Sequence, residues 1–429
     1  MNATLIRNVN GRKVWDSRGR PTVEVEVSLD SGVRGRAIAP AGASTGSGEA
    51  VDLRDGGKAF GGYGVGRAIA AVNGEIAAEL NGADASNQPA CDRLLIDLDG
   101  TPDKGRLGGN ALIATSMAIA HAAAAAAGQP LWRYLGGDEN AILPLPEIQI
   151  FGGGAHAGRR VDIQDFMVIA TGAADFAQAL DWTAEVYLAA GALMERNGRL
   201  AGVADEGGYW PVFDGNEQAL EFLVRAIEDA GYTPGKDVSI SLDVAASEFG
   251  RGGRYRLARD ERDVDSDGLC EMLMGWLERY PIVSIEDPLA EDDPDGLIAF
   301  TRTAGMRVQI IGDDYLVTNA GRVAAAARDG ACNAVLVKPN QAGTLTETRA
   351  ALDAAVAAGW GAVVSARSGE TEDVTIVHLA VGWGARQLKV GSFARSERMA
   401  KWNEALRIGE ALLSQGRLPP ASAFPWGQV

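Results

Sequence analysis

Histidine and cysteine are both scarce in this chain of 429 residues, with three of each. The cysteines lie far apart and form no Cys-x-x-Cys pair, which excludes a disulfide framework and a cysteine zinc site and favours a reducing, cytoplasmic compartment. Any site that uses an imidazole must draw on very few candidates. The histidines are His121, His156 and His378, and the cysteines are Cys91, Cys270 and Cys332.

Positive charge is also in short supply, because 40 Lys and Arg face 57 Asp and Glu, for a formal net charge of −17. This balance has the wrong sign for a nonspecific grip on nucleic acid or an anionic membrane, and we expect neither as a partner. The first residues lack the basic start and apolar stretch of a signal peptide. The most apolar window, 111–127, is mostly alanine and contains Thr115, Ser116 and His121, which indicates a buried helix instead of a membrane span.

The N-terminal part of the chain predicts an α+β domain. Residues 22–29 alternate strictly between apolar and polar side chains, as a half-buried antiparallel strand does, and a short turn leads into a second strand at 33–38. Helical patterns then dominate to residue 134, and the turn-forming stretch 136–140 precedes a change of rhythm. We therefore predict an α+β domain with an antiparallel meander over residues 1–137 and a second domain over 138–429.

The second domain alternates short β-branched runs with longer helical stretches. This alternation predicts an α/β fold, a TIM-type (β/α)8 barrel, which usually needs about 250 residues. A doubly wound open sheet would alternate similarly and is the structural alternative, although no Gly-x-Gly-x-x-Gly opens a helix directly after a strand. The expected strands are 166–169, 238–242, 282–285, 308–311, 334–337, 362–364 and 387–388.

Carboxylates follow three consecutive runs, as Asp243, Glu286 and Asp313. The carboxyl ends of barrel strands meet on one face, where active sites lie, so these side chains should converge there. Converging carboxylates repel one another unless a cation lies between them, and hard oxygen ligands suit Mg²⁺. The alternative is that each residue is only a turn former or a helix cap.

Cationic residues end the later strands. Lys338 and Lys389 end apolar runs, which is unusual for lysine, and two lysines beside a divalent cation leave one of them neutral enough to act as a base. Arg367 and Ser368 lie between them, at a strand end that enters a helix, and predict a seat for a phosphate or carboxylate. The alternative for this pair is a surface arginine beside a capping serine.

Three loops add polar groups. Residues 41–48 are glycine-rich and carry hydroxyls, as a lid would. His156 lies in a second glycine-rich loop, which is followed by Gln164 and Asp165, and Glu206 lies in a third loop. Together with the Mg²⁺ site, the lysine base and the anion seat, these residues indicate removal of a proton next to a carboxylate group.

A series of motifs along nearly the whole chain resembles the enolase family. The matches include Asp16-Ser-Arg-Gly-Arg-Pro-Thr-Val-Glu-Val, Gly42-Ala-Ser-Thr-Gly, Leu98-Asp-Gly-Thr, Asp205-Glu-Gly-Gly, Ser284-Ile-Glu-Asp-Pro, Gly312-Asp-Asp, Asn340-Gln-Ala-Gly-Thr-Leu-Thr-Glu-Thr, Arg367-Ser-Gly-Glu-Thr-Glu-Asp and Ala394-Arg-Ser-Glu-Arg.

The resemblance implies two Mg²⁺ ions, the second of which depends on the substrate, in the general manner of enolase-superfamily sites. Asp243, Glu286 and Asp313 would hold the first ion, and Ser44 on the lid would close on the second. The catalytic residues implied are Lys338 as the base that removes the α-proton, Glu206 as the acid for the departing β-hydroxyl, Asp165 beside it, and His156 closing from its loop. The substrate-binding residues implied are Arg367, Ser368, Lys389, Gln164 and Ser44.

The sequence departs from the family pattern around the substrate. Ala366 replaces a histidine, and Asp165 replaces a glutamate that is one methylene longer. Further departures are Ala41 for serine, Gly152 for asparagine, Tyr209-Trp210 for Phe-Ala, Tyr315 for leucine and Val390 for threonine. We expect the α-proton chemistry to survive and the pocket to be remodelled, with bulk added at Trp210 and Tyr315.

The leading hypothesis is a Mg²⁺-dependent enolase-type lyase that acts on 2-phosphoglycerate or a close phospho- or phosphono-carboxylate and gives an enolpyruvate product. It would be a specialised paralogue, as in phosphonate metabolism, where carboxyphosphonoenolpyruvate synthase is an example. The alternatives are an ordinary glycolytic enolase and a non-catalytic enolase-fold scaffold. The expected partners are the small-molecule substrate and further copies of the chain, as a homodimer or a larger homo-oligomer.

Overall fold

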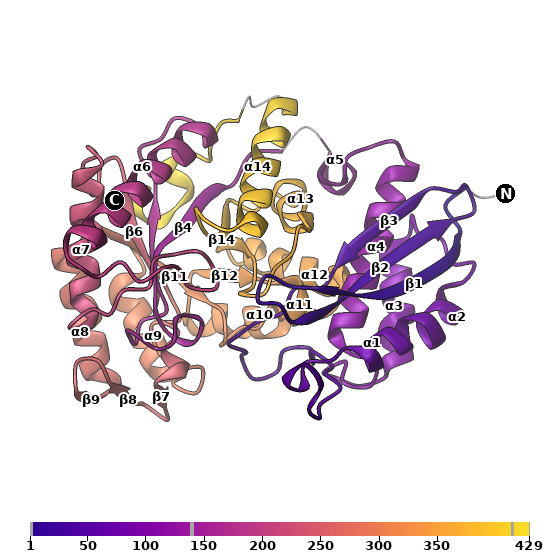
Figure 1. The fold of residues 1–429 in the computed structure, drawn as a ribbon, viewed down its shortest axis with the longest axis horizontal. Coiled ribbons are helices and arrows are strands. Elements are labelled where there is room, and N and C mark those ends of the chain that lie inside the picture. Colours follow the sequence, from indigo (N-terminus) through magenta and orange to yellow (C-terminus); the bar gives the residue numbers. More distant parts are fainter. Residues whose placement is uncertain (1–2, 138–140, 413–415, 429) are drawn as a thin grey trace.

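A computed structural model describes residues 3–137, 141–412 and 416–428. The predicted domain boundary after residue 137 adjoins residues 138–140, which lie outside the described part of the chain. The boundary itself therefore stays a prediction. Figure 1 shows an N-terminal sheet with its helices at one end of the molecule and a barrel at the other.

The chain opens with an antiparallel meander of β1 (Ile6–Trp15), β2 (Pro21–Leu29) and β3 (Arg34–Ile38). Val23, Val25 and Val27 of β2 are fully buried and share a core with α4 (Gly109–Ala126), as the alternation predicts. β1 is not among the predicted strands, because polar residues such as Asn8 interrupt its apolar pattern.

Helix α4 packs tightly across this sheet, because its alanines allow a close approach. A Cβ atom on Gly35 of β3 would lie 2.1 Å from the backbone nitrogen of Ala122, so only glycine fits there. Within the described residues, α4 is the helix long and apolar enough to cross a membrane, and 83% of it is buried in the protein. The other helices of this part are α1 (Gly66–Ala71), α2 (Ala77–Leu80), α3 (Gln88–Asp99) and α5 (Leu131–Gly136).

Among the described residues, eight strands close into a barrel, which confirms the predicted TIM-type fold and excludes the doubly wound sheet. Around the barrel the strands are β4 (Leu145–Gly152), β5 (Asp165–Ile169), β6 (Ser239–Asp243), β10 (Ile282–Glu286), β11 (Gln309–Gly312), β12 (Ala334–Val337), β13 (Gly361–Ser365) and β14 (Gln387–Ser392).

Strand β5 departs from the regular barrel pattern, because it runs antiparallel to both β4 and β6. Asp165, its first residue, is therefore paired with Asp243, the last residue of β6. The reversal places the start of β5 at the mouth of the barrel, where the neighbouring strands end.

Two details of the barrel differ from the sequence prediction. Strand β4 is not among the expected runs, because the polar residues Glu147 and Gln149, both fully buried, interrupt its apolar residues. Strand β14 continues to Ser392, so Lys389 lies within the strand and not at its end, and the pairing with β4 is irregular between Lys389 and Gly391.

Helices surround the barrel, and several begin at a polar residue that caps the first turn. The side chains of Asp175, Asp265, Asp293, Asn319 and Thr344 each accept a hydrogen bond from a backbone N–H of the helix that follows. The helices of this part of the chain are α6 (Phe176–Arg196), α7 (Asn216–Asp229), α8 (Ser266–Arg279), α9 (Pro294–Ala304), α10 (Ala320–Asp329), α11 (Pro339–Ala342), α12 (Leu345–Ala357), α13 (Thr375–Gly382) and α14 (Ser396–Ala411).

The N-terminal part contacts the barrel through α12 and α13 (Figure 1). The buried carboxylate of Asp92 in α3 accepts hydrogen bonds from the backbone N–H and the hydroxyl of Thr346 in α12, at 2.9 and 2.6 Å. His121 lies 2.8 Å from the Thr375 hydroxyl, and His378 lies 3.4 Å from Glu404. Both histidines thus make packing contacts away from the mouth of the barrel.

The C-terminal segment covers the other end of the barrel. Phe424 is buried with Leu145 at the start of β4 and Ile169 at the end of β5, and Trp426 stacks on Phe424 at 4.5 Å. Figure 1 shows this segment beside α6. The barrel is therefore closed at this end, and its opposite end carries the polar groups.

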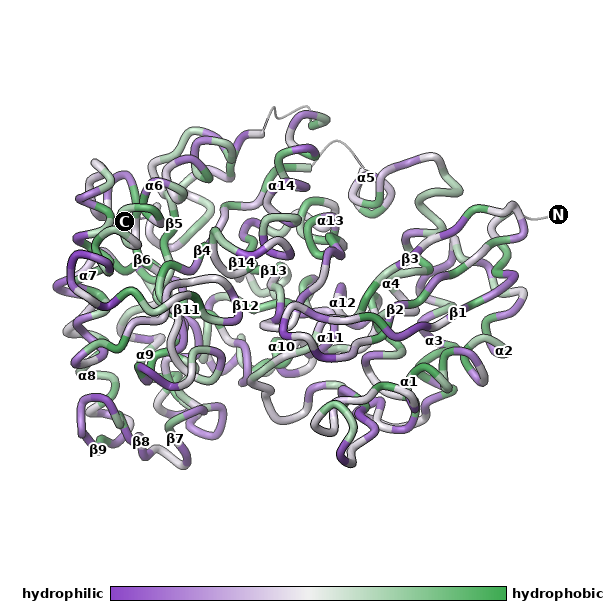
Figure 2. Tube along the Cα trace, in the orientation of Figure 1, coloured by the Kyte–Doolittle hydropathy of each residue, from purple (hydrophilic) through white to green (hydrophobic). Residues whose placement is uncertain are grey.

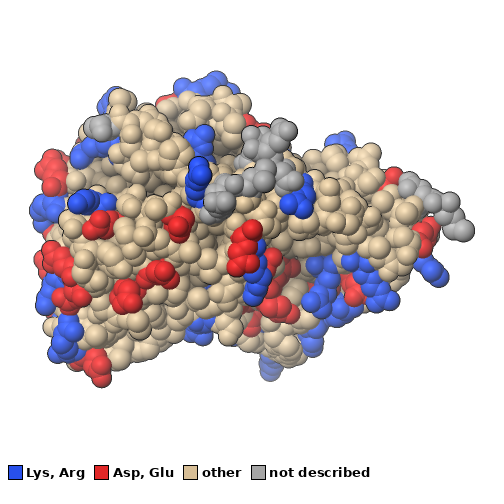
Figure 3. Space-filling model, turned by 90° about the horizontal axis from the view of Figure 1, so that it is seen from above, with Lys and Arg blue, Asp and Glu red and all other residues tan. Residues whose placement is uncertain are grey.

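Figure 2 shows apolar residues concentrated in the barrel strands and in α4. On the face seen in Figure 3, acidic and basic side chains are interspersed over both parts of the molecule. The same pattern appears in the N-terminal sheet, where Arg12 and Arg36 pair with Glu24, and Arg34 pairs with Glu26. Much of the charge is thus spread over a solvated surface.

Candidate active site

The mouth of the barrel brings together most of the residues that the sequence singles out. A small cavity of about 20 Å³ opens there. Glu286 and Asp313 lie behind its wall, each in contact with a lysine that lines it. The lining residues are Ser44, His156, Gln164, Asp165, Glu206, Asp243, Lys338, Ser365, Ala366, Arg367, Ser368, Lys389 and Val390.

Lys389 lies among three carboxylates. Its Nζ is 2.8 Å from Asp243 Oδ2, 2.7 Å from Glu286 Oε2 and 3.8 Å from Asp165 Oδ2. Burial acts to lower the pKa of this lysine, but the carboxylates outweigh burial and hold the pKa well above its ordinary value. Gln164 Nε2 also donates to Asp243 Oδ2, at 3.0 Å. The Asp243 carboxylate is therefore held by two donors.

Lys338 forms a second buried pair, with Asp313. Burial acts to lower the pKa of Lys338, yet the adjacent Asp313 raises it. Burial likewise acts to raise the pKa of Asp313, but Lys338 lowers it, and Gln341 Nε2 donates to Asp313 Oδ1 at 2.8 Å. Lys338 thus keeps its proton here, and it can act as a base only when another cation engages Asp313.

Glu286 is buried and only partly satisfied. Its Oε2 binds Lys389, but its Oε1 has no hydrogen-bond partner among the described residues. Burial, together with the nearby Asp243, raises the pKa of Glu286 well above its ordinary value. A buried oxygen without a partner is costly, and a hard cation between Glu286, Asp243 and Asp313 would provide one. The residues present therefore fit Mg²⁺.

A different acidic triad, which shares only Asp313 with the predicted ligands, lies close enough together to hold a cation. One oxygen each from Asp287, Asp313 and Asp314 lies within 4.8 Å of the others. Asp287 already accepts the backbone N–H groups of Asp313 and Asp314, at 2.8 and 2.9 Å. Burial raises the pKa of Asp287 to about 8 and that of Asp314 to about 9. Asp287 therefore shapes the turn that carries Asp313, and the choice of ligands stays a prediction.

His156 and Asp165 form a buried pair on another side of the cavity. His156 Nε2 lies 2.9 Å from Asp165 Oδ1, and His156 Nδ1 lies 3.9 Å from Glu206 Oε1. Burial lowers the pKa of His156, but Asp165 and Glu206 outweigh it and raise the pKa to about 9. Burial acts to raise the pKa of Asp165, but His156, together with Lys389 and Gln149, lowers it overall. At neutral pH this wall thus presents an imidazolium beside the Asp165 carboxylate.

The predicted anion seat is engaged by the lid in this structure. Arg367 Nη1 lies 2.9 Å from Glu49 Oε2, and Arg367 Nη2 donates to the Ser44 carbonyl at 2.8 Å. The Ser368 hydroxyl accepts the Ala43 N–H at 2.9 Å. An incoming anion would compete with Glu49 for the guanidinium. Glu49 was not among the predicted site residues, and it lies directly after the predicted lid of residues 41–48.

Arg398 of α14 supports this seat from behind. It is fully buried, and its guanidinium donates to the carbonyls of Arg367, Ser368 and Val390 at 2.7, 2.6 and 2.8 Å. All three carbonyls belong to residues that line the cavity, so Arg398 fixes the backbone that carries these side chains. The motif Ala394-Arg-Ser-Glu-Arg contains Arg398 and so pointed to this residue, but the sequence could not show which groups it contacts.

The structure sorts the departures from the family pattern into two groups. Asp165, Ala366 and Val390 line the cavity. Trp210 and Tyr315 are not among its described lining residues, which corrects the expectation that they add bulk to the pocket. Trp210 packs under Arg160, which lies 4.3 Å from its ring, and Tyr315 packs against the barrel core.

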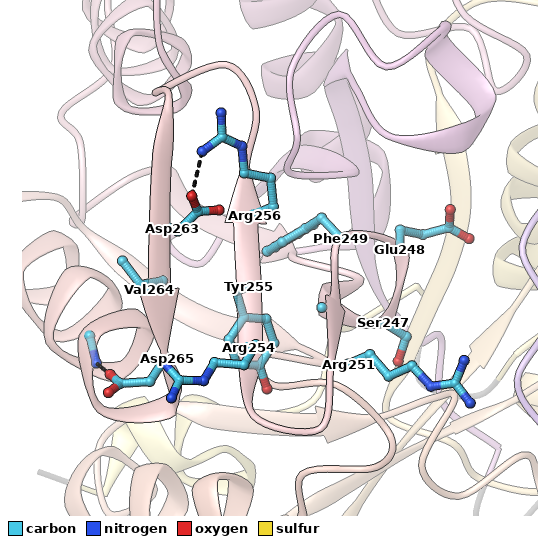
Figure 4. A pocket seen from close by; sticks show the side chains of 12 residues that line it. Ser247, Glu248, Phe249, Arg251, Arg254, Tyr255, Arg256, Asp263, Val264 and Asp265 are labelled. Carbon is cyan, nitrogen blue, oxygen red and sulfur yellow. Dashed lines mark hydrogen bonds and ion pairs between the residues drawn. The ribbon is translucent and has the colours of Figure 1, made fainter.

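A larger hollow, of about 950 Å³, lies outside the barrel mouth. It is formed by β7 (Gly250–Arg251), β8 (Arg254–Leu257) and β9 (Arg262–Asp265), a hairpin sheet that the sequence analysis did not predict (Figure 4). Its polar groups are engaged locally: Arg256 pairs with Asp263, and Asp265 caps α8. None of the predicted site residues lines it, so size alone does not mark the functional cavity.

Two family models match the chain, one for each part of the fold. The enolase N-terminal domain matches residues 6–135, and the enolase C-terminal TIM barrel domain matches residues 140–423. Membership implies an enolase-type lyase fold with a general dependence on Mg²⁺, and the buried acidic groups agree with it. The chain belongs to the enolase family.

Proposed function

We propose that this protein is a Mg²⁺-dependent enolase-type hydro-lyase that removes the α-proton of 2-phosphoglycerate or a close phospho- or phosphono-carboxylate and expels the β-substituent. One observation carries the proposal: the buried carboxylates of Asp243, Glu286 and Asp313 meet Lys338 and Lys389 at the mouth of the barrel. A barrel needs no such cluster for stability, since buried ion pairs seldom stabilise a fold more than apolar packing does.

Asp243, Glu286 and Asp313 would hold the first Mg²⁺, and Ser44 on the lid would approach a second. When bound, Mg²⁺ would replace the ammonium groups as partner of these carboxylates and stabilise negative charge on the substrate. The orphaned Glu286 oxygen supports this assignment. The number of ions is part of the proposal.

The roles of the remaining residues follow from their positions. Lys338, once released from Asp313, would take the α-proton, and Lys389 would orient the substrate carboxylate. Arg367 and Ser368 would hold the phosphate or phosphonate group after Glu49 yields, with Gln164 beside the metal ligands.

The leaving group would depart on the opposite wall. Glu206 would protonate it, with His156 and Asp165 alongside. His156 offers a protonated imidazole within 3.9 Å of Glu206, so this wall contains a source of protons at neutral pH.

A specialised paralogue is favoured because Asp165, Ala366 and Val390 all lie at the cavity. An ordinary glycolytic enolase is the second candidate, and the positions of Trp210 and Tyr315 outside the cavity favour it. The charged site counts against a non-catalytic scaffold. We further propose that the partners are the small-molecule substrate and a second copy of the chain.

The test is an assay of purified protein with Mg²⁺ and each candidate substrate, in which formation of the enolpyruvate product is followed by absorbance. Efficient turnover of 2-phosphoglycerate would select the glycolytic alternative. Faster turnover of a phosphono-carboxylate would select the specialised paralogue. No product from any of them, with or without Mg²⁺, would contradict the proposed function.

A further inference from the structure

Gln149, in the middle of β4, is a buried glutamine that none of the assigned roles uses. Its side chain is fully buried and both ends of its amide are bonded. Oε1 accepts the backbone N–H of Gly208 at 2.8 Å, and Nε2 donates to Asp165 Oδ1. The Gly208 contact fixes the orientation of the amide, because only the oxygen can accept that hydrogen.

The amide therefore joins two parts of one cavity wall. Gly208 lies two residues after Glu206, in the same loop, and Asp165 begins β5. His156 Nε2 reaches the same Asp165 oxygen at 2.9 Å, and it lies 3.2 Å from Gln149 Nε2 because both donors converge on that oxygen. Asp165 Oδ1 is thus held by both an amide and an imidazole.

The surroundings are shaped for this side chain. A Cβ atom on Gly208 would lie 2.4 Å from Gln149 Oε1, and one on Gly152 would lie 3.3 Å from Nε2. The loop backbone is bonded independently on both flanks, since Ser392 N–H donates to the Glu206 carbonyl and Tyr209 N–H donates to the Ile150 carbonyl, each at 2.9 Å. What Gln149 adds is therefore a direct link between this loop and the Asp165 side chain, beside the indirect one through His156, whose carbonyl accepts the Asp205 N–H at 3.3 Å.

We infer that Gln149 is a positioning residue that holds the Asp165 carboxylate and the Glu206 loop in a fixed relation on the leaving-group side of the cavity. This inference rests on the proposed function for its consequence in catalysis. It places Gln149 away from Lys338, which pairs with Asp313. Loss of the amide should therefore impair expulsion of the β-substituent and spare removal of the α-proton.

The experiment compares wild type with Gln149→Met, which keeps the length of the side chain and removes both hydrogen bonds. Gln309→Met is the matched control, because Gln309 is another buried barrel glutamine, bonded to Gln387 and Ser284 instead of to the cavity. Each protein is given 2-phosphoglycerate and Mg²⁺ in D₂O, and α-deuterium exchange and product formation are measured together. Backbone hydrogen exchange of residues 204–210 is measured by mass spectrometry.

In Gln149→Met, product formation should fall about 100-fold, as a small misplacement of a catalytic group does, while α-exchange changes less than about threefold. The backbone N–H groups of residues 204–210 should exchange faster than in wild type. Gln309→Met should change neither the ratio of product formation to α-exchange nor the backbone exchange. An unchanged ratio of product formation to α-exchange in Gln149→Met, whether both reactions fall equally or neither falls, would overturn the inference. If wild type forms no product, the proposed function fails in part or whole, and the backbone exchange then tests the role of Gln149. Unchanged protection of residues 204–210 in Gln149→Met would overturn the inference, and faster exchange would support it.

Discussion

At the scale of single residues, charge in the cavity is set by close buried pairs. His156 is held between Asp165 and Glu206, and Lys389 is held by Asp243 and Glu286. In each case burial opposes the charged form of the base, and the neighbouring carboxylates restore it. The protonation states of the site therefore depend on individual partners.

The His156 pair predicts a titration. In the protein stripped of metal with EDTA, the His156 imidazole should titrate at a pKa of about 9, as followed by NMR. Because this folded-state pKa lies above the unfolded value of about 6.5, the stabilisation is complete below about pH 6.5 and is lost as the pH rises through 9. Asp165→Asn should bring the pKa down toward 6.5. A titration near 6.5 in wild type would contradict this account of the pair.

Ala366 provides a test of substrate preference. It lines the cavity at the position where the family pattern has histidine. If the loss of this histidine changed the substrate specificity, Ala366→His should raise kcat/KM for 2-phosphoglycerate at least about tenfold, within the range of a well-placed acid or base group. Steady-state kinetics of the variant and wild type would measure this. An unchanged value would show that the position is neutral.

At the scale of elements, the lid and the residue that follows it contact the barrel. Glu49, directly after the lid, binds Arg367, while Ser47 of the lid donates its N–H and hydroxyl to Glu291, both at 2.9 Å. Ala43 and Ser44 of the lid also contact Ser368 and Arg367, so the contact between Ser47 and Glu291 is one that does not involve the anion seat.

Glu49→Gln should therefore bind inorganic phosphate about tenfold more tightly, because Arg367 loses its competing carboxylate. Titration calorimetry with phosphate measures this. Glu291→Gln is the matched control, since it loosens the lid without touching Arg367, and it should bind phosphate as wild type does. Equal phosphate affinity in Glu49→Gln and wild type would show that Glu49 does not compete for the seat.

The sequence predicted those elements whose side chains alternate or form unbroken apolar runs. Asp243 and Glu286 were located because each ends such a run. Strand β4 was missed because the buried polar side chains of Glu147 and Gln149 interrupt its apolar pattern. No local pattern could show that β5 is reversed, since strand direction depends on pairing partners. The supporting residues Gln149, Glu49 and Arg398 act through contacts between segments far apart in the chain, which spacing cannot reveal.

At the scale of the whole molecule, the N-terminal part provides the lid and must be held in place against the barrel. Asp92 of α3 is fully buried and accepts hydrogen bonds from Thr346 on the barrel side and from Ser116 in α4, the latter at 2.6 Å. The two parts are thus joined by a polar contact as well as by apolar packing.

Asp92→Ala should lower the free energy of unfolding by about 3 kcal/mol, because several buried donors lose their acceptor. Denaturant unfolding measures this. Asp97→Ala, on the same helix but in an exposed pair with Arg93, should change stability by less than about 0.5 kcal/mol. A loss no larger in Asp92→Ala than in Asp97→Ala would rule out the polar contact as a support of the assembly.

We propose that the fold as a whole serves to remove a proton next to a carboxylate group, with Lys338 as the base. Incubation of the protein with 2-phosphoglycerate and Mg²⁺ in D₂O, followed by NMR, reports this step whether or not product forms. We predict α-deuterium incorporation by wild type that falls at least about 100-fold in Lys338→Ala and is abolished by EDTA. Exchange that persists in Lys338→Ala, or no exchange by wild type with this or any related phospho- or phosphono-carboxylate, would contradict the account.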